Sequence, residues 1–257
     1  GVIHPLKTKR YDEVNHKSTA ELLNRAAETG IRRFLLVSSS ACVGYNSQND
    51  DLFDETADYP PRGEYGRSKM LMELEAKKYW ESEELHTTII RPPWFYGPMG
   101  PPRQRRFFRL IREGKIPVIG SGSNRRSMVF LPKLCEAIAL ASTRNVARNS
   151  LYWIADDSPY EFKKIIETIQ TVFREELNVS SATTVRRLPS FVGGLSTALS
   201  NFTESLGLHF KSLHVMSELN KTIACDVSKA KNELGFSPKE SLRPGITRTL
   251  RSECFNS

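Results

Sequence analysis

A tyrosine and a lysine four residues apart, Tyr65 and Lys69, are the side chains in this sequence best spaced to do chemistry together. The stretch from Tyr65 to about Glu84 has the composition of a helix, and residues four apart on a helix share one face. The lysine ammonium could therefore lie near the phenol. A free tyrosine titrates near pH ~10, and a neighbouring buried cation favours its phenolate form. Such a phenol could move a proton on a hydroxyl or carbonyl group while a nicotinamide exchanges hydride.

Three serines precede this pair. The apolar run Phe34–Val37 predicts a buried strand, and Ser38, Ser39 and Ser40 follow it directly. A serine at the end of a neighbouring strand could hydrogen-bond the substrate oxygen that the tyrosine also contacts. The alternative is structural: a capped strand followed by an ordinary helix with a solvated lysine.

The two motifs together resemble one known family. Ser-Ser-Ser-Ala-Cys-Val-Gly-Tyr at 38–45, followed by Tyr-Gly-Arg-Ser-Lys at 65–69, is similar to the extended short-chain dehydrogenases/reductases. These include nucleotide-sugar epimerases and dehydratases and 3β-hydroxysteroid dehydrogenase-like enzymes. The resemblance implies that Tyr65 is the catalytic acid/base, that Lys69 holds the cofactor ribose and tunes Tyr65, and that Ser40 binds the substrate oxygen. It implies NAD or NADP as cofactor.

Other matches to this family imply further site residues. Asn15 resembles the asparagine of a "VNxxGT" motif that steadies the site, although it could simply cap its helix. Arg91-Pro-Pro-Trp-Phe-Tyr-Gly-Pro98 resembles "RPxxxYGP", and 116–130 resembles a cap-domain turn that ends with a substrate-binding arginine. The cofactor-binding residues implied are Asn15, Ser38, Tyr65, Lys69, Pro92 and Pro93, and the substrate-binding residues are Ser40, Trp94 and Arg126.

Alternating strand and helix patterns predict an α/β fold. We expect strands at Val2–His4, 34–37, 87–90, 150–154 and near 184–188, with helices at 11–27, 65–84, up to Ala141 and 160–177. Met70, Leu71 and Leu74 would form the apolar side of the second helix. This order predicts a partial Rossmann-like, doubly wound parallel sheet that starts at about the fourth strand of the family, with a small C-terminal substrate-binding cap.

The predicted domains follow from the same matches. Residues 1–98 would form a partial NAD(P)-binding domain, and residues 99–257 a mixed cap from which about 132–160 return to the sheet. The closing segment 226–246 resembles the family's "DxSKAxxxLGxxPxxxLxxGI". The family's glycine-rich turn and first strands have no counterpart here. The chain is therefore expected to be a fragment or a truncated protein, with an uncovered sheet edge and an uncovered apolar helix face.

The composition narrows the choice of ligands and compartments. With 39% hydrophobic and 26% charged residues and a formal charge of +8, the chain suits an anionic ligand such as a nucleotide sugar. Nucleic-acid binding is not expected, because Phe107 and Phe108 within the basic stretch 103–109 read as core. The cysteines, Cys254 included, form no CxxC pair, so we expect no metal site and reduced thiols in a cytoplasmic protein. No apolar run approaches the ~20 residues of a membrane span. A homodimer is compatible with the sequence.

Three functions remain open. The first is an NAD(P)-dependent sugar-nucleotide epimerase or dehydratase that acts by hydride transfer at a hydroxyl or carbonyl carbon. The second is a 3β-hydroxysteroid or flavonoid-type alcohol dehydrogenase, which the aromatic residues Trp94 and Phe95 would suit. The third is a truncated, non-catalytic binding protein.

Overall fold

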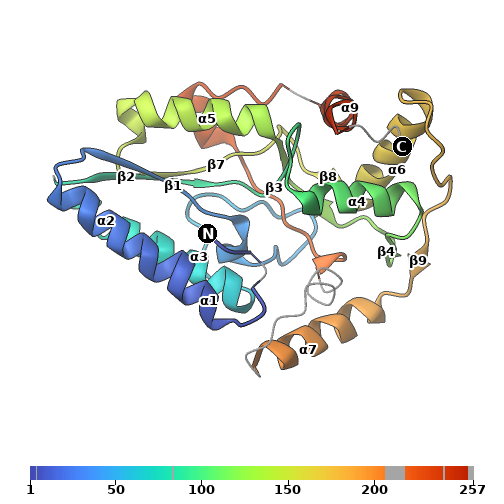
Figure 1. Ribbon diagram of the computed structural model, residues 1–257, viewed down its shortest axis with the longest axis horizontal. Coiled ribbons are helices and arrows are strands. Elements are labelled where there is room, and N and C mark those ends of the chain that lie inside the picture. Colours follow the sequence, from blue (N-terminus) through green and yellow to red (C-terminus); the bar gives the residue numbers. More distant parts are fainter. Residues whose placement is uncertain (4, 83, 206–217, 240, 254–257) are drawn as a thin grey trace.

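A three-stranded parallel sheet forms the centre of one half of the molecule (Figure 1). The computed structural model describes residues 1–3, 5–82, 84–205, 218–239 and 241–253. The strands lie in the order β1 (Arg33–Val37), β2 (His86–Arg91) and β7 (Ser150–Trp153). β2 is buried along nearly its whole length, as expected for a β-branched central strand of a parallel sheet.

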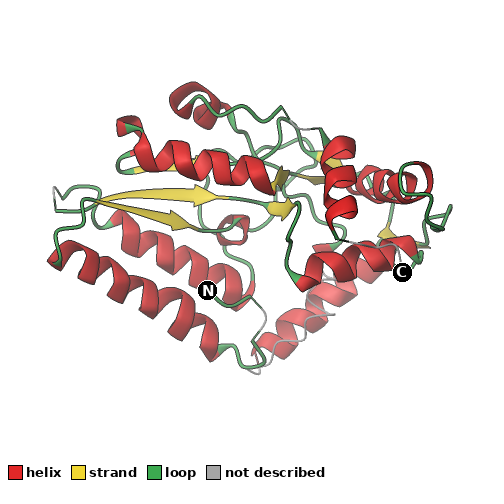
Figure 2. Ribbon diagram, turned by 45° about the horizontal axis from the view of Figure 1, so that its top comes forward, coloured by secondary structure: helices red, strands yellow, loops and turns green. Residues whose placement is uncertain are grey.

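Helices cover both faces of this sheet (Figure 2). On one face, α2 (Ser18–Glu28) and α3 (Gly63–Lys77) pack against the sheet through a core that includes Leu23, Met72 and Ile89. On the other face lies α5 (Leu131–Thr143), with Leu134, Ala137 and Ala141 in its core. Helices on both faces of a parallel sheet make the doubly wound arrangement, so the predicted α/β fold class is confirmed.

A second hydrophobic core lies beyond the carboxyl ends of the strands. It joins α4 (Pro102–Arg112), α6 (Phe162–Glu175) and α9 (Leu242–Ser252) through buried side chains such as Phe108, Ile165 and Ile246. Three pairs of short strands lie beside it: β3 (Trp94–Tyr96) with β6 (Met128–Phe130), β4 (Val118–Ile119) with β9 (Arg187–Leu188), and β5 (Arg125–Arg126) with β8 (Tyr160–Glu161). The helix α7 (Phe191–Ser205) follows β9, and the π-helical turn Ala230–Leu234 packs in the core beside α5.

The chain crosses between the two cores more than once. α5 and β7 follow the first elements of the second core in sequence, yet β7 pairs with β2 in the sheet and α5 packs against its face. The predicted domain bounds, with the division at residue 98 and the return of about 132–160, stay predictions.

The N-terminal segment differs from the sequence-based prediction. Val2 and Ile3 do not form a strand, and His4 lies outside the described residues. The side chain of Asn15 accepts a hydrogen bond from the Val2 N–H (2.7 Å) and donates one to the Val2 carbonyl (2.9 Å). The Val2 N–H and carbonyl, which a neighbouring strand would use, are therefore both hydrogen-bonded to Asn15. After α1 (Lys9–Tyr11), Asn15 lies in a π-helical segment, Asp12–Lys17, that leads into α2.

Helix α3 is shorter than predicted and buries a different face. It ends at Lys77, and Leu74 of the predicted apolar side is 40% exposed. The buried face instead carries Lys69 and Glu73 together with Gly66 and Ala76. The prediction was wrong because this helix turns polar groups inward, toward partners that apolar periodicity cannot detect.

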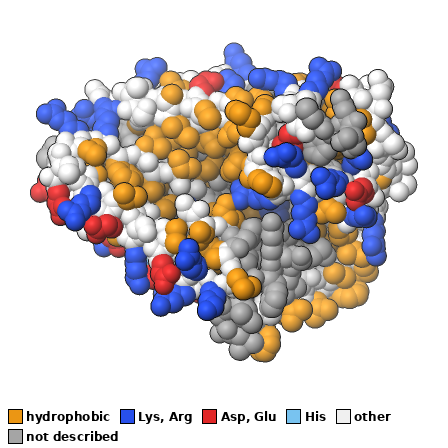
Figure 3. Space-filling model, viewed as in Figure 1, with side chains coloured by type: hydrophobic (Ala, Val, Ile, Leu, Met, Phe, Trp, Pro, Cys, Tyr) orange, Lys and Arg blue, Asp and Glu red, His pale blue; other side chains and the backbone are white. Residues whose placement is uncertain are grey.

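One edge of the sheet carries exposed apolar side chains. β1 is an edge strand, Val37 at its end is 41% exposed, and Leu22 on α2 is 58% exposed. Figure 3 shows apolar side chains gathered between α5 and α2, over this edge.

In the part of the chain that the structure describes, no helix has the length and hydropathy to cross a membrane. Cys254 lies outside the described residues.

Candidate active site

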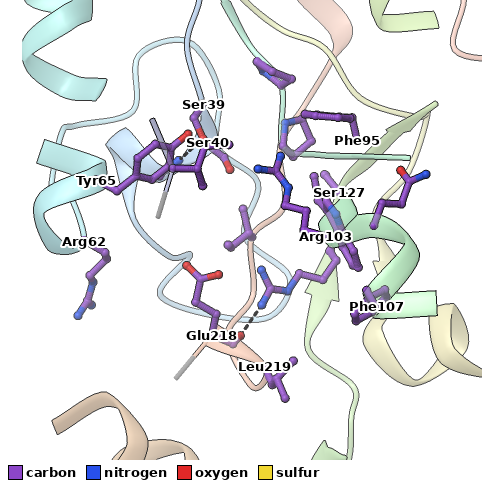
Figure 4. A pocket seen from close by; sticks show the side chains of 18 of the residues that line it. Ser39, Ser40, Arg62, Tyr65, Phe95, Arg103, Phe107, Ser127, Glu218 and Leu219 are labelled. Carbon is purple, nitrogen blue, oxygen red and sulfur yellow. Dashed lines mark hydrogen bonds between the residues drawn. The ribbon is translucent and has the colours of Figure 1, made fainter. Parts of the chain in front are cut away.

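A cavity of about 670 Å³ opens beyond the carboxyl ends of β1 and β2, between the sheet and α4 (Figure 4). Ligands of open α/β sheets bind at this edge, because the loops that follow the strands converge there. The cavity brings together most of the residues singled out in the sequence. Its lining includes Ser38, Ser39, Ser40, Tyr65, Lys69, Pro92, Pro93, Trp94 and Arg126.

Tyr65 faces the serine turn. β1 ends at Val37, and the chain continues through Ser39 in an extended conformation into a 3₁₀ turn, Ser40–Val43. The Ser39 hydroxyl accepts a hydrogen bond from the Ala41 N–H (3.3 Å), and it lies near enough to the Tyr65 phenol to lower the pKa of that phenol. Ser40 is buried beside it and donates its backbone N–H to the Pro92 carbonyl (3.2 Å). Spacing in the sequence selects the serine run but not which hydroxyl reaches the tyrosine.

Burial raises the pKa of Tyr65, and the Ser39 hydroxyl and the Arg103 guanidinium partly offset that rise. Arg103, from the first turn of α4, is therefore a cation that favours the Tyr65 phenolate in this structure. Sequence reasoning did not single out Arg103, which stood only in a basic run. The assignment of Lys69 as the group that tunes Tyr65 stays a prediction.

Lys69 is held in the cavity wall with little solvent. Its side chain is 9% exposed, its Nζ lies 3.8 Å from the Met72 sulfur, and burial lowers the pKa of its ammonium group. It has no oxygen partner among the described residues. A Cβ added at Gly1 would lie 3.7 Å from this Nζ, so the N-terminal backbone also borders the space.

These groups fit the ribose and nicotinamide half of a dinucleotide. Lys69 offers N–H donors without oxygen partners, and Pro92 and Pro93 line the cavity without any backbone N–H to leave unsatisfied. Asn15 does not line the cavity but stands behind it. Its amide ties Val2 to Ser68 of α3, whose hydroxyl it meets at 3.1 Å. Ser38 also lines the cavity, and its buried hydroxyl has no hydrogen-bond partner among the described residues.

Behind Ser38 lies a buried ion pair that sequence reasoning missed. The Arg91 Nη2 donates to Glu73 Oε2 at 2.7 Å, and both side chains have 0% exposure. Tyr59 donates its hydroxyl to Glu73 (2.7 Å), the Cys42 thiol approaches the same carboxylate (3.2 Å), and the guanidinium stacks on the Tyr59 and Trp153 rings. The pair links α3 to the end of β2 and so fixes the helix that carries Tyr65.

At the other end of the cavity, Arg126 lies beside Glu218. It donates a hydrogen bond to the Glu218 carbonyl, while its buried Nε has no hydrogen-bond partner among the described residues. Tyr45 lies 3.5 Å from the Glu218 carboxylate through its hydroxyl. Trp94 packs edge-on against Phe107 of α4, with ring centroids 4.5 Å apart. This end therefore combines a partly unsatisfied cation with an aromatic surface.

The cavity is strongly basic. Only one carboxylate, that of Glu218, is present in its described lining, against six basic side chains: Arg62, Lys69, Arg103, Arg106, Lys115 and Arg126. Charges of one sign in a confined cleft focus the field on an oppositely charged ligand. The site therefore suits a ligand that carries several negative charges.

Comparison with known proteins identifies the family of this chain. The model of the NAD dependent epimerase/dehydratase family matches residues 6–155. The chain belongs to this family. With it, the resemblance to extended short-chain dehydrogenases/reductases is confirmed.

Within the epimerase/dehydratase family, the chain is 40% identical to y4nL of Sinorhizobium fredii, an uncharacterized protein, over 97% of this chain and 70% of the relative. It is 24% identical to the UDP-glucose 4-epimerase of Vibrio cholerae over 94% of this chain and 69% of that enzyme. Another relative is the sterol-4-alpha-carboxylate 3-dehydrogenase of Saccharomyces cerevisiae, 25% identical over 93% of this chain and 71% of that protein.

Solved structures of the epimerase/dehydratase family share the fold. The UDP-glucuronic acid 4-epimerase of Bacillus cereus, solved with NAD, superposes with a TM-score of 0.71 over 95% of this chain and 69% of that one, at 20% identity. Together with the parallel sheet, this establishes the fold as a Rossmann-like one.

Proposed function

We propose that this protein is an NAD(P)-dependent oxidoreductase of the epimerase or dehydratase type that acts on a nucleotide sugar. The observation that carries the proposal is one cavity in which Tyr65, Ser39 and Ser40 face Arg103 and Arg126. The phenol and the hydroxyls suit a sugar oxygen, and the Arg126 guanidinium suits the charge of a nucleotide diphosphate.

The residues of the chain would divide the work as follows. Ser40 would hold the reacting hydroxyl, and Tyr65 would take its proton as the alcohol is oxidised and return it on reduction. Lys69 would donate hydrogen bonds to the cofactor ribose, with Pro92 and Pro93 against the nicotinamide. A bound NAD or NADP would supply the hydride acceptor. Arg126, whose Nε is buried without a described partner, would contact the diphosphate.

A second candidate has an observation in its favour. Trp94, Phe107, Leu110 and Ile116 give the cavity an extensive apolar wall, which suits a sterol-type alcohol in an otherwise similar reaction. The basic lining favours the nucleotide sugar, since an uncharged alcohol would leave those cations unmatched.

Titration of NADH and of NADPH, followed by nicotinamide fluorescence and by the thermal midpoint, tests the proposal. We expect saturable binding of one cofactor and a raised midpoint, then a further rise with UDP-glucose or UDP-glucuronic acid. A rise with a 3β-hydroxysteroid alone would favour the second candidate. A folded protein that binds no cofactor and no substrate would overturn both and favour a non-catalytic binding protein.

A further inference from the structure

Arg103 lies beside Tyr65 in the cavity and has no anionic partner among the residues that the structure describes. It lies in the first turn of α4, lines the cavity beside Tyr65 and Ser40, and stacks on the Phe95 ring at 5.5 Å from guanidinium to centroid (Figure 4). In the described parts of the chain it makes no hydrogen bond and no ion pair. Its five N–H donors are thus available to a ligand.

The fold places this charge where it is unfavourable. The N-terminal end of a helix carries partial positive charge, so a cation in the first turn of α4 is repelled, and no acidic residue stands in that turn. Burial also lowers the pKa of Arg103. The neighbouring cations find some compensation: Arg126 bonds the Glu218 carbonyl, and Arg62 stacks on Tyr45. Arg103 has the face of the Phe95 ring but no hydrogen-bond acceptor among the described residues, and a bound anion would supply one.

The position of Arg103 specifies where that anion would sit. Arg126 stands at the Glu218 end of the cavity, where a diphosphate would meet it, whereas Arg103 stands beside the tyrosine and serines that would hold the reacting hydroxyl. A planar guanidinium pairs with a carboxylate or a phosphate through two parallel hydrogen bonds, and since Arg126 meets the diphosphate, a carboxylate suits Arg103. The second anion therefore belongs next to the hydroxyl.

We propose that the substrate is a 3-hydroxy acid, with a carboxylate on the carbon adjacent to the one that bears the reacting hydroxyl, and that Arg103 is the residue that selects it. The inference rests on the proposed function, because it uses the same site. Two kinds of molecule carry this unit: a nucleotide uronic acid, with its 4-hydroxyl and 5-carboxylate, and a sterol with a 3-hydroxyl and a 4-carboxylate.

The experiment compares ligands that differ only at the carboxylate. Dissociation constants are measured by calorimetry, with saturating NADH, for UDP-glucuronic acid against UDP-glucose and for 4α-carboxy-5α-cholestan-3β-ol against 5α-cholestan-3β-ol. We expect one acid to bind about ten- to a hundredfold tighter than its neutral counterpart, the range of a hydrogen-bonded charge pair. The pair that shows the preference identifies the source.

Variants assign the preference to a residue. Arg103→Gln should bring the ratio of the two dissociation constants close to one, because the glutamine amide keeps N–H donors but carries no charge. Arg105→Gln, on the same helix but exposed and outside the cavity lining, should retain the preference. Circular dichroism and thermal midpoints establish that both variants fold.

The outcomes separate this inference from the proposed function. Binding of a neutral ligand with no preference for its acid would overturn the inference and leave the function standing. A preference unchanged in Arg103→Gln, or an equal loss of affinity for both members of a pair, would also overturn it, the latter by giving Arg103 a general role at Tyr65. No binding of any of the four would overturn both.

Discussion

Two polar regions lie back to back at the carboxyl ends of β1 and β2, and they treat charge in opposite ways. In the first, behind Ser38, the Arg91 guanidinium meets the Glu73 carboxylate at 2.7 Å and stacks on two aromatic rings. Burial raises the pKa of Tyr59, and the Glu73 charge adds to that rise, so its hydroxyl stays a donor to that carboxylate.

In the second region, the cavity, charge is left unmatched. Six basic side chains line it against one carboxylate, and neither Arg103 nor Lys69 has an oxygen partner among the described residues. A buried charge without a partner is costly, so a fold retains one where a ligand compensates it. The two regions therefore differ in role: the paired charges of Arg91 and Glu73 hold α3 in place, and the unpaired charges of the cavity suit a bound ligand.

Removing the reactive group of the cavity tests this separation with the largest expected effect. Tyr65→Phe should lower turnover of the bound nucleotide sugar by about 10²–10⁴-fold, the usual contribution of a general acid/base. Cofactor affinity and thermal midpoint should stay close to those of the parent protein, because the phenol hydroxyl belongs to the cavity and not to the ion pair behind it. Turnover at the parental rate would remove Tyr65 from its proposed role.

A substitution in the buried Glu73–Arg91 pair should instead lower the stability of the fold. Glu73→Gln leaves Arg91 buried without a counter-charge, and removing one partner of a buried pair costs about 3–5 kcal/mol of unfolding free energy. Denaturant unfolding measures it. Glu75→Gln is the control, because Glu75 lies on a different face of α3 and forms an ion pair with Lys78 at the surface. It should change the free energy of unfolding by under about 1 kcal/mol. Equal effects of the two substitutions would contradict a special place for the Glu73–Arg91 pair.

The Glu73–Arg91 pair should also have a smaller effect on how the free energy of unfolding changes at acid pH. Burial by itself raises the pKa of Glu73, but the hydrogen bonds and charge of Arg91 and the hydrogen bond from Tyr59 outweigh it and hold the pKa below its ordinary 4.5. A carboxyl group with a lowered pKa in the folded state stabilises the protein above 4.5, and this contribution is lost as pH falls through the folded-state value. We expect unfolding free energy to drop below pH 4.5 more steeply in the parent protein than in Glu73→Gln. Parallel curves would show that other carboxylates set the slope.

The same two regions mark what the sequence could predict. Spacing was sufficient for the Ser38–Ser40 turn, for Tyr65 and Lys69, and for the strands on either side, since these features are local and repeat a family pattern. The pairing of Glu73 with Arg91 was missed, because it joins residues 18 apart on a helix and a strand. So was Arg103, whose place across the cavity depends on how the second core docks against the sheet.

The reactivity of the cysteine thiols gives the smallest expected difference between the buried ion-pair region and the protein surface. Burial and the neighbouring Glu73 charge raise the pKa of Cys42 well above its ordinary value, and burial raises the pKa of Cys225 to about 12, whereas Cys135 on α5 is exposed. In a Cys254→Ser background at pH 8, a colorimetric disulfide reagent should modify one thiol rapidly in the native protein and the other two only on unfolding. Cys135→Ser should abolish the rapid phase. In Glu73→Gln we expect Cys42 to become reactive as the ion pair loosens, and a Cys42 that stays protected there would mean that packing alone, and not the matched charges, keeps this region closed.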